Sequence, residues 1–166
     1  MAMNLLRRKK KLVFPLVRVD DRLLHGQVIV GWVQALRLSP VYVACDRILR
    51  DPSFADTLRD LIPPGAVGDI ISLETASQIW SNGELKNSRP MIVLEHPVDA
   101  LKLIRLGAPM KTLTLGGMHF REDRIEFLPY IFVSEWDQVT LREIRQAGVT
   151  IFCQDLPTTK PTPYNG

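Results

Sequence analysis

Short apolar segments alternate with helix-patterned segments along this 166-residue chain. Strands that are apolar at nearly every position have both faces covered, which is typical of parallel sheets flanked by helices. We therefore predict an α/β fold: an open, doubly wound, mostly parallel sheet of about seven strands with helices on both faces. The strand candidates are residues 12–18, 41–45, 67–72, 91–95, 112–115, 130–133 and 149–153.

The segments between these candidates carry the start and stop signals of helices. Asp51 with Pro52 is typical of a helix start, Ser134 with Asp137 of a capping box, and Gly148 of a helix end. We expect helices over 26–36, 53–62, 74–80, 97–106 and 138–147, a surface loop over 81–88, and an extended surface tail over 156–166.

Composition indicates a folded domain that stays in water, with 46% hydrophobic and 23% charged residues. No apolar run approaches the roughly 18 residues of a membrane span. The net charge is +3, but the basic leader, residues 1–11, holds five of the 21 cations, so 16 cations oppose 18 acids in the remainder. The predicted single domain, residues 12–166, therefore offers no basic face for nucleic acid. The leader either contacts an anionic surface or is solvated.

Two further observations favour the cytoplasm. The apolar part of the leader is too short for a signal peptide, and no small-residue cleavage site follows it. Cys45 and Cys153 each end a hydrophobic run, as reduced thiols in buried strands do. We therefore expect a cytoplasmic protein.

The segment VRVDDRLLHGQV, residues 17–28, gathers charged residues at the end of the first strand candidate. Open α/β sheets bind ligands beyond the carboxyl ends of their strands, so this position favours a functional role. A neutral imidazole can attack phosphorus through a ring nitrogen, which makes His25 a candidate phosphoryl acceptor. Asp20 or Asp21 would accept a hydrogen bond from a ring N–H and fix which nitrogen reacts.

Donors for a phosphoryl group surround the same histidine in the sequence. Arg22 and Arg18 would supply guanidinium groups, and the amides of Gly26 and Gln27 would form an anion site at the helix start. The residues alone leave another interpretation open, in which His25 only caps a helix and the charged triplet forms local ion pairs.

The segment TLGGMHF, residues 114–120, follows the fifth strand candidate. Gly116 and Gly117 predict either close backbone approach or positive φ, at the same edge as His25. His119 is either a secondary contact to phosphate or partner, or a packing or surface residue. We assign no chemistry to His96 and expect it to be exposed at a helix start.

Other interpretations are weaker. A metal site of His25, Asp20 and His119 lacks close ligand spacing. An aspartyl-phosphate receiver would need an acceptor Asp at the end of the third strand, where Ser72 stands, while Asp69 comes too early. The three tryptophans occupy apolar helical positions and predict core or interface anchors: Trp32, Trp80 and Trp136.

The motif RVDDRLLHGQV (18–28), with GW at 31–32, strongly resembles the signature of IIB components of the mannose/fructose/sorbose class of the bacterial sugar phosphotransferase system (PTS). The resemblance extends over about residues 12–161. The further matching segments are VYVACD (41–46), PPG (63–65), PVDALKLIRLGAP (97–109), LTLGGMHF (113–120) and GVTIFCQDLP (148–157).

The resemblance implies a cytoplasmic α/β phosphocarrier with a seven-stranded, mostly parallel sheet and no metal or organic cofactor. It would accept a phosphoryl group from a phosphohistidine of a IIA protein and pass it to a sugar held by membrane IIC and IID partners. His25 would carry the group on Nδ1, with Arg22 in contact with it, Asp20 and Arg18 shaping the pocket, and the GGMH segment nearby. A regulatory IIB-like module without sugar transport is the alternative, and homo-oligomerisation is left open.

Overall fold

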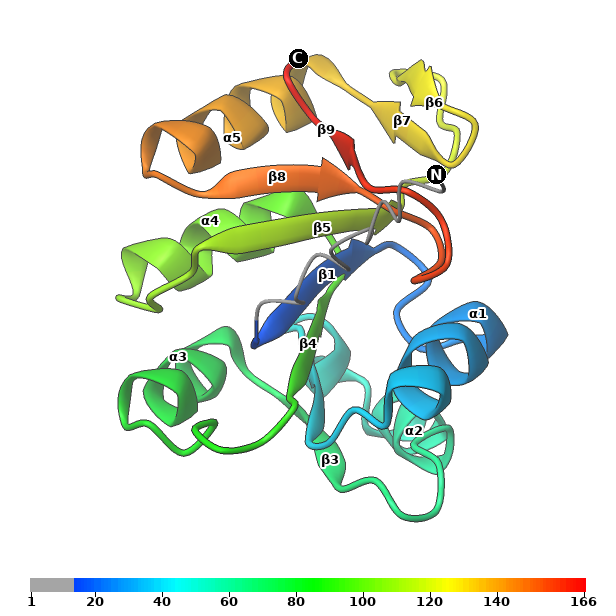
Figure 1. Ribbon diagram of the computed structural model, residues 1–166, viewed down its shortest axis with the longest axis vertical. Helices are drawn as coiled ribbons and strands as arrows, with labels where there is room; N and C mark the ends of the chain where they lie inside the picture. The colour runs from blue at the N-terminus through cyan, green and yellow to red at the C-terminus, as the bar shows by residue number, and fades with distance from the viewer. Residues whose placement is uncertain (1–13) are drawn as a thin grey trace, which may run out of the picture.

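The computed structural model describes residues 14–166; the predicted leader at 1–11 lies outside the described residues. A sheet of seven strands crosses the molecule in the order β3-β2-β4-β1-β5-β8-β9 (Figure 1). Six strands run parallel, and β9 runs antiparallel to β8. The strands are β1 (Leu16–Asp20), β2 (Val41–Ala44), β3 (Gly68–Ile71), β4 (Met91–Leu94), β5 (Thr112–Gly117), β8 (Thr150–Cys153) and β9 (Thr162–Pro163).

Helices cover both faces of this sheet, which confirms the predicted doubly wound α/β class (Figure 1). One face carries α1 (Gly26–Val28), which continues as the π-helix η1 (Ile29–Gln34), and α2 (Pro52–Asp60), which follows the short 3₁₀ turn η2 (Ile48–Arg50). The other face carries α3 (Leu73–Ser81), α4 (Pro97–Arg105) and α5 (Glu135–Gln146). None of the helices in residues 14–166 has the length and apolar character needed to span a membrane.

The two layers explain why the strands are apolar at successive positions. In β4, Met91 and Val93 pack under α1 and α2, whereas Ile92 and Leu94 pack under the helices of the opposite face. All four residues are buried. Because successive side chains of a strand point to opposite faces, a strand covered on both sides is apolar throughout.

Several local predictions are confirmed at the helix ends. The Asp51 carboxylate accepts from the Phe54 amide at the start of α2. Ser134 and Asp137 form the predicted capping box of α5. Gly148 has a φ of 88° after that helix, a left-handed conformation that favours glycine.

Other predictions were wrong in their details. The strand predicted at 130–133 is β7 (Ile131–Val133), but it pairs with β6 (Ile125–Leu128) in a separate hairpin. The seventh strand of the main sheet is instead β9, in the tail predicted to run along the surface, and Tyr164 beside it is buried in the core.

Three more expectations need correction. The helix predicted over 26–36 is present with those bounds, but residues 29–34 form π-helix and not α-helix. His96 is the N-cap of α4 and is partly buried, with its Nε2 4.0 Å from Glu95 Oε2. Trp32 is a core residue as predicted and Trp80 packs partly against the core, but Trp136 is 79% exposed in the first turn of α5, so it is no core residue and only the interface role predicted for it remains.

The connections of the sheet place two loops together. The chain leaves β1 towards β2 over the face of α1, and it leaves β5 towards β8 by way of α5 on the other face. Because β1 and β5 are neighbours and their connections diverge, their carboxyl ends form the topological switch point of the sheet. The two segments that the sequence singled out follow these two strands.

Candidate active site

The loop between β1 and α1 holds His25 in one position. The Leu23 amide donates to the Asp20 carbonyl at 2.9 Å, which closes a turn directly after β1. Leu23 has a φ of 58°, a conformation that costs a leucine on the order of 1 kcal/mol. The buried side chains of Leu23 and Leu24 offset this cost and tie the loop to the core under α1. His25 then follows as the N-cap of the helix, without a side-chain capping bond.

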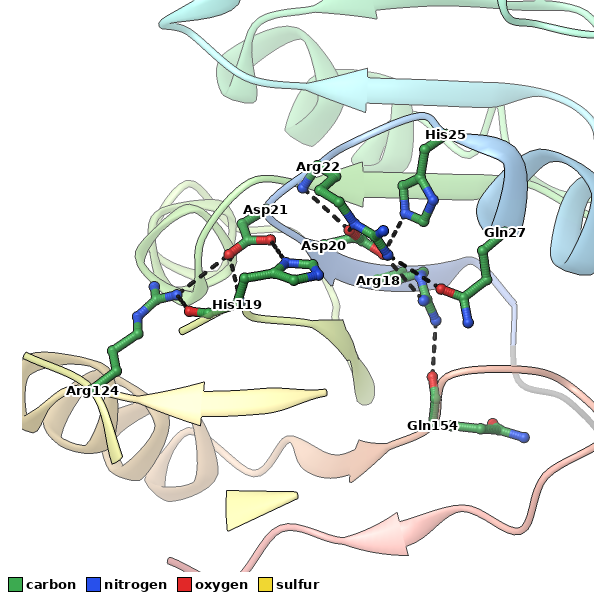
Figure 2. A network of polar contacts seen from close by, with 9 residues as sticks. All are labelled: Arg18, Asp20, Asp21, Arg22, His25, Gln27, His119, Arg124 and Gln154. Carbon is green, nitrogen blue, oxygen red and sulfur yellow. Dashed lines mark hydrogen bonds and ion pairs between the residues drawn. The ribbon is translucent and has the colours of Figure 1, made fainter. Parts of the chain in front are cut away.

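The imidazole of His25 contacts the carboxylate of Asp20. His25 Nε2 lies 3.0 Å from Asp20 Oδ2, and the His25 side chain is 17% exposed (Figure 2). An ionised carboxylate only accepts hydrogen bonds, so the ring carries its proton on Nε2 when neutral. Nδ1 is then left with a free lone pair, which is the arrangement a nucleophilic histidine needs.

The buried side chain of Arg18 forms an ion pair with Asp20 on the interior side of the site. Arg18 Nη2 donates to Asp20 Oδ2 at 3.2 Å, and Nη1 donates to the Gln154 carbonyl at 2.9 Å. Arg18 is fully buried, with its guanidinium carbon 5.1 Å from the ring centroid of Trp32. The Trp32 indole in turn donates to the Asp155 carbonyl at 2.7 Å. Arg18 therefore fixes Asp20, and segments after β8 fix Arg18.

Electrostatics keep this carboxylate charged. Burial alone would raise the pKa of Asp20, but the hydrogen bond with His25 and the positive charge of Arg18 outweigh burial, so the pKa lies below its ordinary value. Burial lowers the pKa of Arg18, and Asp20 opposes that effect. Asp20 is consequently an ionised acceptor for His25 at neutral pH.

Gly116 and Gly117 leave the space that the side chains of Arg18 and Asp20 occupy. A Cβ on Gly116 would lie 1.8 Å from the Arg18 guanidinium carbon, and one on Gly117 would lie 3.1 Å from the Asp20 carboxyl. The sequence left open whether these glycines serve close approach or positive φ; the structure shows close approach. Both belong to β5, which is longer than the predicted strand at 112–115.

Arg22 lies on the open side of Asp20. Its amide donates to Asp20 Oδ1 at 3.2 Å, its Nε lies 3.8 Å from the same oxygen, and its side chain is about half exposed. Its Nη2 donates to Gln27 Oε1 at 3.3 Å, across the start of α1 (Figure 2). Gly26 borders open space, since a Cβ there would meet nothing within 4 Å. A cation and a helix start thus flank the exposed part of the His25 ring.

Asp21 organises the other half of the site. Its Oδ2 accepts from the His119 amide at 2.8 Å, and its Oδ1 lies 2.5 Å from His119 Nδ1. Arg124 Nη1 donates to Asp21 Oδ2 at 3.3 Å and to the His119 carbonyl at 3.0 Å. Its Nε pairs with Asp137 of α5 at 3.2 Å. Arg124 therefore joins the loops after β1 and β5 to the start of α5.

The structure brings all the predicted site residues to one edge of the sheet, but it gives Arg18 a buried position beneath Asp20. Arg124, Gln154 and Asp155 were not among the predicted site residues, because they reach the site from far along the chain. His119 contacts Asp21 and not Asp20, and residues 14–166 contain no group of three side chains suited to holding a metal ion. Asp69, weighed for the receiver alternative, is half exposed at the start of β3 and pairs with Arg59.

Comparisons with known proteins agree with this fold. Residues 14–165 match the family described as PTS system sorbose subfamily IIB component. The sorbose-specific EIIB component of Lacticaseibacillus casei is 26% identical over 152 residues, which cover 92% of this chain and 91% of that protein. N-acetylgalactosamine-specific phosphotransferase enzyme IIB component 2 of Escherichia coli strain K12 is 30% identical over 145 residues, which cover 86% of this chain and 90% of that protein.

A solved structure gives the same result. The IIBSor domain of the sorbose permease from Klebsiella pneumoniae has a TM-score of 0.80 and 26% identity, covering 89% of this chain and 90% of that domain. The fold is that of a phosphotransferase domain of the PTS. The chain belongs to the mannose/fructose/sorbose family of PTS IIB components, as its motifs indicated.

Proposed function

We propose that His25 accepts a phosphoryl group from a phosphohistidine of a IIA protein and passes it to a sugar held by membrane IIC and IID partners. One observation carries this proposal: a partly exposed imidazole has its Nε2 bound to a buried, ionised Asp20, which leaves Nδ1 as the reactive nitrogen. Membership of the IIB family supports it, since PTS IIB components act between IIA and membrane partners.

The chemical step balances without a cofactor. The lone pair of His25 Nδ1 forms the new N–P bond while the N–P bond of the donor breaks and its electron pair returns to the donor ring. Each ring keeps the proton on its other nitrogen, and for His25 that proton stays in the hydrogen bond to Asp20. In the transfer to the sugar, a hydroxyl oxygen of the sugar forms the new O–P bond while the N–P bond of His25 breaks. The electron pair of that bond returns to Nδ1, and the sugar hydroxyl releases its proton.

The surrounding residues supply position and charge, which is most of what phosphoryl transfer requires. Arg22 is the cation that reaches the phosphoryl oxygens, because its side chain is half exposed beside Asp20. The amides of Gly26 and Gln27 begin the helix, where backbone N–H groups have no carbonyl partner four residues earlier. Arg18 acts through Asp20 and does not touch the phosphoryl group, because it is fully buried.

The partners define where the protein works. A carrier that meets a IIA protein and then the inner face of a membrane permease is expected in the cytoplasm. The basic leader at 1–11 precedes the described residues. Its removal would test whether it affects binding to the IIA protein or to the permease.

The test uses a phosphorylated IIA protein of the mannose class as donor, with the modified side chain mapped by mass spectrometry under alkaline conditions. The wild type is expected to carry one phosphoryl group on His25, and His25→Ala none. His96→Asn is the matched control, since the ring of His96 lies near Glu95 and asparagine is also a good N-cap. Normal labelling of His25→Ala would refute the proposal.

A further inference from the structure

A second carboxylate–histidine pair lies beside the first. Asp20 and Asp21 are consecutive, and each contacts one histidine from a different part of the chain. Asp20 contacts Nε2 of His25 and leaves Nδ1, whereas Asp21 contacts Nδ1 of His119 and leaves Nε2. The two rings are therefore held by opposite nitrogens.

Several contacts fix the second pair. The main chain of His119 donates to Asp21 and accepts from Arg124, and its ring binds Asp21 as well. Arg124 is buried and is itself held by Asp137, so the loop after β5 is tied to two other elements. The His119 side chain nevertheless remains 48% exposed. A ring fixed at one nitrogen and open at the other is suited to contact a group that arrives at the site.

The direction of the open nitrogen identifies that group. Figure 2 shows the ring of His119 bound to Asp21 on one side, with its other nitrogen turned towards Asp20 and Arg22, on the side of His25. We propose that His119 is a second phosphoryl-positioning residue, whose Nε2–H donates a hydrogen bond to the phosphoryl group on His25. This inference rests on the proposed function.

The contact depends on the charge of the ring. Asp21 requires a proton on Nδ1, so Nε2 carries a proton only in the imidazolium form. A dianionic phosphoryl group nearby favours that form. The charged groups facing His119 are Asp21 and Arg124 on the side of its own loop, and Asp20, Arg22 and His25 across the site. The hydrogen bond therefore forms when the phosphoryl group is present.

Two substitutions separate this role from a structural one. In His119→Asn the amide nitrogen replaces Nδ1 and keeps the bond to Asp21, but nothing replaces Nε2. In His119→Gln the amide nitrogen reaches the position of Nε2 as a neutral donor. Labelling of His25 by phosphoramidate, a small phosphoryl donor, measures the effect without any partner protein, and His96→Asn is the control.

We expect His119→Asn to label about 10-fold more slowly than the wild type, as the loss of a hydrogen bond to a charged group predicts. His119→Gln should be intermediate. In ¹⁵N NMR of the wild type, the His119 ring should shift towards the imidazolium form when His25 is phosphorylated.

Contrary results are distinguishable. This inference alone would be overturned if the wild type is labelled, His119→Asn is labelled at the same rate, and the NMR signals of the His119 ring do not change on phosphorylation. A wild type that takes no label on His25 would overturn the proposed function, and this inference with it.

Discussion

Gly116→Ala tests the packing beneath the site. The new Cβ would lie 1.8 Å from the guanidinium carbon of Arg18 and 2.2 Å from Nη1. Arg18 cannot stay in place, because it is fully buried and is held by Asp20 and by the Gln154 carbonyl. Its displacement breaks a buried ion pair, which costs about 3–5 kcal/mol, more than the 1–3 kcal/mol typical of overpacking alone.

Urea unfolding followed by circular dichroism measures this loss. A domain of ordinary stability has about 5–15 kcal/mol, so the midpoint of Gly116→Ala should fall clearly below that of the wild type. Gly26→Ala is the matched control, because a Cβ there meets nothing within 4 Å and the free energy of unfolding should change by only about 0.5 kcal/mol. Equal midpoints for the two variants would refute the account of Arg18 and Gly116.

Three further predictions concern the charged residues. Arg22→Ala should slow labelling of His25 by phospho-IIA about 10²-fold, as loss of a transition-state donor does, and an unchanged rate would remove Arg22 from the mechanism. Arg124→Met leaves Asp21 and Asp137 without their buried partner and should lower the free energy of unfolding by about 3 kcal/mol in urea titrations; a wild-type midpoint would contradict this. The pKa of Asp20 is lowered in the folded protein, so its stabilising contribution is full above the ordinary value of 3.8 and is lost as the pH falls through the folded value. Asp20→Asn should therefore lose less stability than the wild type on acidification below about pH 4, and an identical acid dependence would count against the Arg18–Asp20 pair.

The sheet could be predicted because its strands carry a strong pattern. A strand such as β4, buried on both faces, is apolar at every position, and glycine or proline marks the ends of several helices. The edge of the sheet lacked such a signal. β9 consists of Thr162 and Pro163 alone, and only its hydrogen bonds with β8 make it a strand.

The site was predictable where its chemistry is local. His25, Asp20 and Arg22 stand within a few residues of one another, at the end of β1 and in the loop that follows it. The contacts of Arg18 with Gln154, and of Arg124 with Asp21, span 136 and 103 positions and depend on how β1, β5 and β8 are arranged. The burial of Arg18 follows from this tertiary packing, and the sequence alone could not distinguish a buried arginine from one at the surface.

The position of the phosphoryl group on the ring tests the central claim most directly. Uniformly ¹⁵N-labelled protein, phosphorylated by a IIA donor, would be examined by NMR at alkaline pH, where coupling to phosphorus identifies the bonded nitrogen. Because Asp20 occupies Nε2 of His25, the account predicts phosphorus on Nδ1 of that residue. Phosphorus on Nε2 of His25, or on any other side chain, would contradict it.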